Sequence, residues 1–403
     1  PVLITPVRLA LFLMLPVAVI YTVRIIPRLT SFDVAYLLFS LWTCFCIIIH
    51  YDIAVGIQRA GQFFMETFLI YVIVQGSVNT YEKFERYISI FIFSISVLLV
   101  LAIIEQVAGY PIHVNFLRQV FGGTLLERSI GERLGLIRVT TIFPHPILFG
   151  LFCASALSYA VYSSKSNMGA LIRSAIISGA TFFSLSSGPL LVLVVQYAMI
   201  IGEVVSRGVK RRALIFFAGL ASFLTLVQIV ASRGIFALAL LFVFSQQTAY
   251  YRRDIWDFGV RNVARNPIFG MRPEDWERAH WMTPSIDNYW LFQAMQGGLP
   301  SVVLLLSAIT LIMWKAFSRP VPHTPIQLAN LRRGWAYSIA AMALCGVTVH
   351  FYGKLQPFFA LQIAMGGAVV RLIMDWEAAT QSQNDLRSAA TDGEASSRPR
   401  TAL

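Results

Sequence analysis

The sequence has unusually little charge for its length. Only 13% of its 403 residues are charged, about half the ~25% of an average soluble domain. That leaves too little polar surface to cover a water-soluble globule. The composition therefore excludes an ordinary cytosolic enzyme, a disordered protein and a nucleic-acid-binding module.

Cysteine is also scarce, and no metal-ligand pattern accompanies it. Cys44, Cys46, Cys153 and Cys345 all lie inside apolar stretches, where cysteine usually acts as a small buried hydrophobe. No Cys/His spacing is typical of a metal site, and no disulfide framework is visible. We expect neither a metal ion nor another cofactor.

Apolar residues dominate, at 57% of the chain, which is typical of a polytopic membrane protein. A spanning helix needs about 20 apolar residues. Stretches that meet this test are 8–26, 31–50, 53–75, 87–108, 141–162, 213–231, 288–316, 335–352 and 355–373. The region 169–204 is too long for one helix and is interrupted at Ser184–Pro189, so two short helices are expected there. The first stretch lacks a cleavage site and is expected to span the membrane. The predicted fold is an all-α membrane protein with about eleven transmembrane helices.

Short basic loops predict the orientation of these helices. Four loops carry the charge, at Lys83 and Arg86, Lys165 and Arg173, Arg207–Arg212, and Lys315–Arg333. All fall on one side, together with the polar tail, and this side is expected to be cytoplasmic. The chain then divides into an N-terminal transmembrane bundle (1–231), an outer loop with short helices (232–287), C-terminal transmembrane helices (288–373) and a disordered tail (374–403).

The net charge of +12, from 32 Lys and Arg against 20 Asp and Glu, is only partly explained by topology. The outer loop 232–287 holds seven arginines and no lysine, on the side where topology needs no positive charge. Arginine binds phosphate or carboxylate through a planar fork, whereas lysine is a point charge. The alternative is pairing with acidic residues of the same loop: Asp254, Asp257, Glu274, Asp275 and Glu277.

Two stretches combine arginine with a helix end. In the first, Arg138 precedes a helix that begins at Pro144-His145-Pro146, and the N–H groups of such an end favour an anion. His145 is alternatively a polar cap at the membrane surface. In the second, residues 252–264 are expected to form an amphipathic helix that ends at Asn266-Pro267, preceded by an apolar segment (234–244) too short to span.

A third stretch places a carboxylate at the outer mouth of a membrane helix. Asp287 is either the N-cap of that helix or a general base beside the basic cluster, where it would stay ionised. Glu66 and Glu105 lie in apolar helices, where carboxylates are functional candidates. Arg59 is poorly placed to pair with Glu66, so another partner is expected.

At these three stretches the sequence resembles the superfamily of O-antigen ligases and Wzy-type polysaccharide polymerases. The family has an arginine before a proline-containing helix start, which is similar to Arg138 and 144–150. It then has a Ser-Arg-Gly break, which is similar to 184–188, where Ser187 replaces the arginine. A long outer loop follows, with an Arg–Trp helix and an Asn-Pro motif, similar to 252–256 and 266–270, where Arg272 replaces a glycine. The loop ends in a motif similar to 287–299, with Asp287 where many members have histidine. This departure favours the exopolysaccharide polymerases as the closer relatives.

The resemblance implies a GT-C-like fold and metal-independent, inverting glycosyl transfer at the periplasmic face of the bacterial inner membrane. The implied donor and acceptor are glycans on undecaprenyl pyrophosphate. The implied pyrophosphate ligands are Arg138, Arg252 or Arg253, and Arg265, and Asp287 is the implied base. Residues placed for sugar contact are Tyr251, Trp256, Trp281, Asn288 and Tyr289, although an aromatic belt at the membrane interface is the alternative for the rings. Further candidates are His145, His280 and Glu105.

Three other functions stay open. A ligase would transfer the glycan to lipid A core. A transporter or flippase of the lipid-linked glycan would use the same arginines, but it predicts charges at the membrane midplane and internal repeats, and no clear repeat is found. A scaffold would use the outer loop for docking, although no sequence signature of a protein partner is present.

Overall fold

The computed structural model describes residues 6–111, 116, 120, 131–206, 246–318 and 325–396. Its helices are α1 (Pro6–Leu13), α2 (Leu15–Ile25), α3 (Ser31–His50), α4 (Ile53–Phe64), α5 (Ile70–Ser77), α6 (Tyr81–Ala108), α8 (Pro146–Ala154), α9 (Leu157–Tyr162), α10 (Asn167–Phe182), α11 (Ser187–Val205), α14 (Gln246–Arg265), α15 (Tyr289–Phe317), α16 (Ile326–Cys345) and α17 (Leu355–Ser396). A π-helical turn, η2 (Met65–Leu69), joins α4 to α5, and η1 (Ile26–Arg28) and η3 (Pro273–Asp275) are 3-10 turns. Strands β1 (Glu132–Arg133) and β2 (Leu136–Ile137) form a small antiparallel hairpin, with Arg133 opposite Leu136.

This is a helical membrane protein. Within the described residues, α3, α6, α11, α15 and the first part of α17 are long and apolar enough to cross a bilayer. The expected spans 8–26, 53–75 and 141–162 are divided into shorter helices, and 335–352 overlaps the end of α16. The span 213–231 and the apolar segment 234–244 lie outside the described residues. The count of about eleven spans and the GT-C-like fold stay predictions.

Local sequence explains most of the helix ends. Thr30 and Asp33 form a capping box at the start of α3, which satisfies backbone donors that no helical carbonyl can reach. The expected break at Ser184–Pro189 is confirmed, because α10 ends at Phe182 and α11 begins at Ser187. The expected helix over 252–264 is also confirmed. It begins earlier, at Gln246, and ends at Arg265, directly before Asn266-Pro267, since the residue before a proline disfavours helical geometry.

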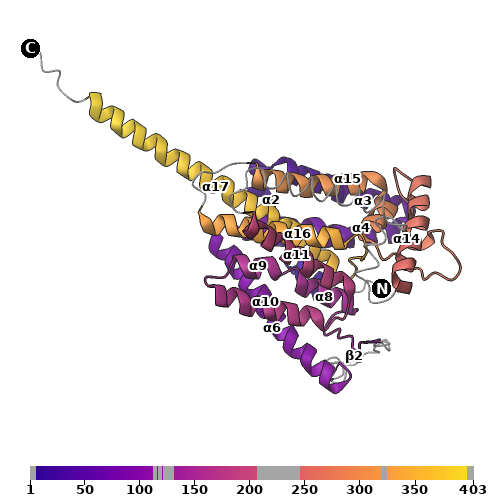
Figure 1. The fold of residues 1–403 in the computed structure, drawn as a ribbon. Coiled ribbons are helices and arrows are strands. Elements are labelled where there is room, and N and C mark those ends of the chain that lie inside the picture. Colours follow the sequence, from indigo (N-terminus) through magenta and orange to yellow (C-terminus); the bar gives the residue numbers. More distant parts are fainter. Residues whose placement is uncertain are drawn as a thin grey trace, which may run out of the picture.

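The tail was predicted to be disordered from residue 374, and this is wrong as far as Ser396. Helix α17 continues through the polar sequence and extends beyond the other helices (Figure 1). The segment 374–396 contains no proline, one glycine and five alanines. Alanine prolongs a helix that the apolar part has already nucleated. Helix α16 also differs, since it begins at Ile326 rather than near 335.

The basic loops that the structure describes gather at one end of the bundle, which we call the basic end, while the expected basic loop 207–212 lies outside the described residues. Arg86, Lys165 and Arg173 line one cavity there. Arg333 pairs with Glu203 at 2.9 Å, and Tyr162 and Tyr337 donate hydrogen bonds to the same carboxylate. These contacts join the end of α9, the end of α11 and the start of α16. Helix α14 lies at the other end (Figure 1), which we call the loop end.

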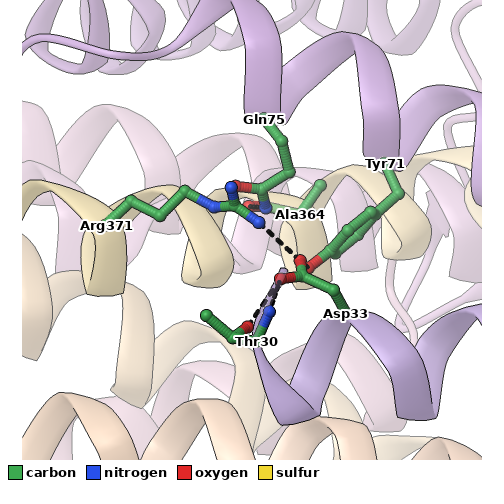
Figure 2. A network of polar contacts seen from close by, with 6 residues as sticks. All are labelled: Thr30, Asp33, Tyr71, Gln75, Ala364 and Arg371. Atoms are coloured by element: carbon green, nitrogen blue, oxygen red, sulfur yellow. Dashed lines mark hydrogen bonds and ion pairs between the residues drawn. The ribbon is translucent and has the colours of Figure 1, made fainter. Parts of the chain in front are cut away.

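A buried polar network ties three helices together (Figure 2). Asp33 on α3 accepts hydrogen bonds from the Thr30 backbone and hydroxyl and from Tyr71 on α5. Arg371 on α17 donates to Asp33 Oδ1 at 2.7 Å. Close by, Gln75 donates to the carbonyl of Ala364 at 2.7 Å. The network satisfies a carboxylate that the apolar core would otherwise exclude.

The two other intramembrane carboxylates are also held. Glu66 pairs with Arg8 at 2.7 Å. This confirms that Glu66 has a partner other than Arg59. Arg59 pairs instead with Glu274 at the loop end. Glu105 is fully buried and accepts from the backbone N–H of Thr140 and Thr141, at 2.9 Å each.

Candidate functional site

Two of the sequence-predicted stretches, those of His145 and Asp287, meet at the loop end around one cavity of about 250 Å³. The cavity is lined by His145, Ile147, Leu148, Ser285, Asp287, Thr348, Val349, His350 and Tyr352. The helices α8, α15 and α17 begin at or near these residues. Their positive dipole ends therefore face this end of the bundle, which favours an anion there.

The first stretch is held so that Arg138 reaches the break between α10 and α11. Glu105 fixes the backbone of Thr140 and Thr141 directly after Arg138. Val139 N–H donates to the carbonyl of Phe183 at 3.0 Å. Arg138 Nη2 then donates to Ser186 Oγ at 2.9 Å. The stretch that resembles the family's arginine motif and the one that resembles its Ser-Arg-Gly motif are thus in direct contact, and Glu105 is a positioning residue rather than part of the cavity wall.

The positively charged guanidinium groups of Arg133, Arg138 and Arg252 lie close enough to influence one another's pKa. Burial, and then the charge of Arg133, lowers the pKa of Arg138 to about 10. Burial and the charge of Arg252 lower the pKa of Arg133. Arg133 also donates to the carbonyl of Leu185 at 2.9 Å. All three remain charged at neutral pH, so they form a concentrated positive field.

Two of these arginines have a buried N–H group that donates no hydrogen bond to the described residues. The Nε atoms of Arg138 and Arg252 are closed to solvent and have no hydrogen-bond partner among the described residues. Burial lowers the pKa of Arg252, while the charge of Asp287 counteracts this. Buried guanidinium donors are normally satisfied. An anionic ligand that accepted from both arginines would supply the hydrogen-bond acceptors that these Nε–H groups lack among the described residues.

The structure separates Arg252 from Arg253. Arg252 faces inward, toward Arg133 and Asp287. Arg253 is exposed and lies 3.8 Å from Asp257 on the same helix. Adjacent helical residues point about 100° apart, so Arg253 points away from the side that Arg252 faces.

Asp287 does not cap α15. That role belongs to Asn288, whose Oδ1 accepts from Leu291 N–H at 2.9 Å and whose amide donates to the carbonyl of Val347. Asp287 Oδ1 instead accepts from the Ser285 hydroxyl at 2.8 Å, and the carboxylate lines the cavity. The N-cap alternative is therefore wrong for Asp287, and its carboxylate can take part in chemistry.

His145 caps α8 and lines the cavity at the same time. Its Nδ1 accepts from Ile147 N–H at 3.2 Å, so the polar-cap interpretation is confirmed. The capping bond fixes the ring orientation, because Nδ1 must be the acceptor.

His350 is a cavity residue that the sequence did not reveal. It was included in an expected membrane span (335–352), but α16 ends at Cys345 and His350 lies in the following loop. Its ring centroid is 4.1 Å from that of Phe292. Its Nδ1 is closed to solvent and lacks a partner among the described residues. Burial lowers its pKa to about 4, so the ring is neutral at pH 7 and can accept a proton or a hydrogen bond.

The aromatic candidates divide into exposed and packed rings. Trp281 is 57% exposed and Trp256 36%. Tyr251 lies edge-on to Trp281 at 6.2 Å. Tyr289 is only 4% exposed and stacks on Phe351 at 4.7 Å. Trp281, Trp256 and Tyr251 are accessible to a sugar ring, whereas Tyr289 and Asn288 hold the start of α15 in place.

Among the sequence-predicted residues only His145 and Asp287 line the cavity itself, and two others lie at the surface. Arg265 pairs with Glu277 at the surface, where both side chains are 63% exposed. The pairing alternative therefore holds for this arginine. His280 is exposed in the loop that precedes α15.

We expect acid to destabilise the protein through His350. An unfolded histidine protonates near pH 6.5, but the folded one does so only near pH 4. The unfolded state therefore gains the proton first. The stabilisation is complete above pH ~6.5 and falls by up to about 1.4 kcal/mol per pH unit toward pH 4. Thermal unfolding in detergent at pH 7 and pH 5 measures this, and His350→Gln should show the smaller shift. Identical shifts in both proteins would contradict the assignment.

No protein-family model matches the chain, and no curated protein matches it significantly.

Proposed function

We propose that the protein is a glycosyltransferase of the bacterial inner membrane, which polymerises lipid-linked oligosaccharide repeat units at the periplasmic face. The observation that carries the proposal is the convergence of Arg138, Arg133 and Arg252 beside the carboxylate of Asp287. Pre-placed guanidinium groups suit a pyrophosphate leaving group. The carboxylate suits the activation of a hydroxyl.

In the proposed reaction an acceptor sugar hydroxyl attacks the anomeric carbon of a glycan on undecaprenyl pyrophosphate. The new C–O bond forms as the bond to the pyrophosphate oxygen breaks on the opposite face, which inverts the anomeric centre. Asp287 takes the hydroxyl proton. Arg138 and Arg252 stabilise the negative charge that grows on the departing pyrophosphate. Trp281 and Trp256 are exposed and Tyr251 is half-buried beside Trp281, and all three are proposed to stack on sugar rings.

The positions of the intramembrane charges favour an enzyme over a transporter. A transporter is expected to have binding groups near the midplane. Among the described residues, Asp33 pairs with Arg371 and Glu66 with Arg8, while Glu105 accepts two backbone N–H groups. These groups are already occupied by partners within the protein. Arg138 and Arg252, to which we assign a function, lie instead at the loop end. The Nε atom of each is buried and has no partner among the described residues.

The direct test uses purified protein and lipid-linked repeat units. Longer chains on the lipid support a polymerase, whereas transfer only to added lipid A core indicates a ligase. Unchanged glycans that cross a vesicle membrane would overturn the enzyme proposal in favour of transport.

The neighbouring arginines of α14 give this assay a matched pair. We expect Arg252→Ala to lower the rate of polymer formation by about 10²–10³, the usual effect of removing one donor to a developing anion. Arg253→Ala removes the same charge one residue later, but from the exposed face, and should stay within about twofold of the unmodified protein. The rate of repeat-unit consumption measures both. Equal losses would indicate a general effect of charge and would count against the assigned geometry.

A further inference from the structure

The basic end contains a second, larger cavity that the proposed function does not use. Its volume is about 560 Å³, within the ~300–1,000 Å³ typical of small-ligand pockets. It lies between the start of α6 and the loop that joins α9 to α10. Both signs of charge line it: Arg86, Lys165 and Arg173, with Glu82 and Glu85.

The three cations come from α6, from the loop after α9 and from α10, and their side chains line the same cavity. None of them forms an ion pair with a described residue. Arg173 Nη1 donates to Ser163 Oγ at 3.2 Å, which orients its guanidinium toward the loop. Positive charge on this side is what membrane topology requires. Topology does not explain why these cations surround one cavity or why two carboxylates share it.

The loop adds further groups suited to a phosphate. Ser166 caps α10 by accepting from Gly169 N–H at 3.1 Å. Ser163 and Ser164 also line the cavity, and the Ser164 hydroxyl donates to the carbonyl of Ala160 at 2.6 Å. The cations, the Ser163 hydroxyl and the start of a sixteen-residue helix together provide donors for a phosphodiester. Glu82 and Glu85 can accept hydrogen bonds from an ammonium group.

Apolar side chains continue from the cavity along the same two helices. On α6, Ile90 and Phe93 are 58% and 68% exposed. On α10, Leu171 and Ile172 are 64% and 53% exposed. In a membrane protein these surfaces face lipid tails. The polar cavity thus adjoins a surface for acyl chains, which a soluble phosphate would not need.

We propose that this cavity binds the headgroup of a phospholipid of the phosphatidylethanolamine type. Arg86, Lys165 and Arg173 hold its phosphodiester, and Glu82 and Glu85 accept from its ammonium group. A choline headgroup has no N–H to donate, and a glycerol headgroup has no cation for the carboxylates. The site is independent of the glycosyltransferase chemistry at the loop end.

Native mass spectrometry of the purified full-length protein tests this proposal. The protein is mixed with equal amounts of phosphatidylethanolamine, phosphatidylcholine and phosphatidylglycerol, and retained lipids are identified by mass. We expect about tenfold more phosphatidylethanolamine than either competitor, the effect of about one charge-assisted hydrogen bond. Equal retention of all three, or a preference for phosphatidylglycerol, would overturn the proposal.

Variants then locate the binding. The double variant Arg86→Gln and Arg173→Gln should retain about tenfold less phosphatidylethanolamine. Arg28→Gln is the matched control, because Arg28 is 70% exposed and pairs with Asp375 rather than lining the cavity. Glu82→Gln with Glu85→Gln should keep lipid binding but lose the headgroup preference. Undiminished retention in the arginine variant would overturn the assignment, as would displacement of the lipid by inorganic phosphate alone. The comparison of headgroups on the unmodified protein needs no variant to fold.

Discussion

Asp287→Asn should lower polymer formation by about 10²–10⁴, the range expected when a general base is removed. The amide keeps the size of the side chain and its bond from Ser285, but it cannot take a proton. The rate of chain extension on lipid-linked repeat units measures the loss. Retained binding of those units, with extension lost, would separate chemistry from binding.

Two variants make the assignment of Asp287 sharper. Asp287→His should retain part of the activity, because many members of the superfamily that the chain resembles have histidine at this position. His350→Gln tests the other proton acceptor in the cavity wall. Full activity in Asp287→Asn with loss in His350→Gln would transfer the role of base to His350 and refute the role proposed for Asp287.

The second large effect concerns stability. Arg371→Leu should destabilise the protein by about 3–5 kcal/mol, because it leaves the carboxylate of Asp33 buried without its cation. The side chains of the two residues are only 15% and 3% exposed. Thermal unfolding in detergent measures the change, and activity at low temperature should persist, since neither residue lines the cavity at the loop end.

The double variant Asp33→Asn with Arg371→Leu is the control for this prediction. Removing both charges avoids an unpaired buried ion and should recover most of the lost stability. A double variant that is as unstable as Arg371→Leu alone would show that side-chain packing, rather than the charge, is what matters.

Sequence patterns predicted the elements whose signals are local. The expected span 31–50 coincides with α3, and the break at Ser184–Pro189 and the end of α14 fall where Pro and Gly place them. Arg138, Arg252 and Asp287 were identified because charge stands out against an apolar background. The polar tail was mispredicted because low hydrophobicity resembles disorder, although the segment lacks proline and continues a helix that begins in the apolar part of α17.

Other features depend on tertiary contacts that no local pattern encodes. Arg133 becomes part of the site only through its position beside Arg138 and Arg252. His350 reaches the cavity because the loop after α16 packs against the start of α15, where Tyr289 N–H donates to the carbonyl of Gly346 at 2.8 Å. Glu105 was a functional candidate because it lies in an apolar helix, and the structure shows it holding the backbone of a loop. Choosing Arg252 over Arg253 required the rotation of α14.

Helix α15 is broken at Gly298, whose φ of +67° suits glycine and where a Cβ would overlap the carbonyl of Ile268. At this kink Leu299 N–H donates to the carbonyl of Pro267 at 2.8 Å, and Met271 N–H donates to that of Met295 at 2.5 Å. Trp42 adds a bond to the carbonyl of Gly297 at 2.7 Å.

The first two bonds hold the segment after α14 against α15 at its kink, and the Trp42 bond ties the same turn to α3. Arg252 lies on α14, and Asp287 directly precedes α15. The placement of these two side chains relative to each other therefore depends on the backbone geometry at Gly298, in a turn that is distant from both along the chain.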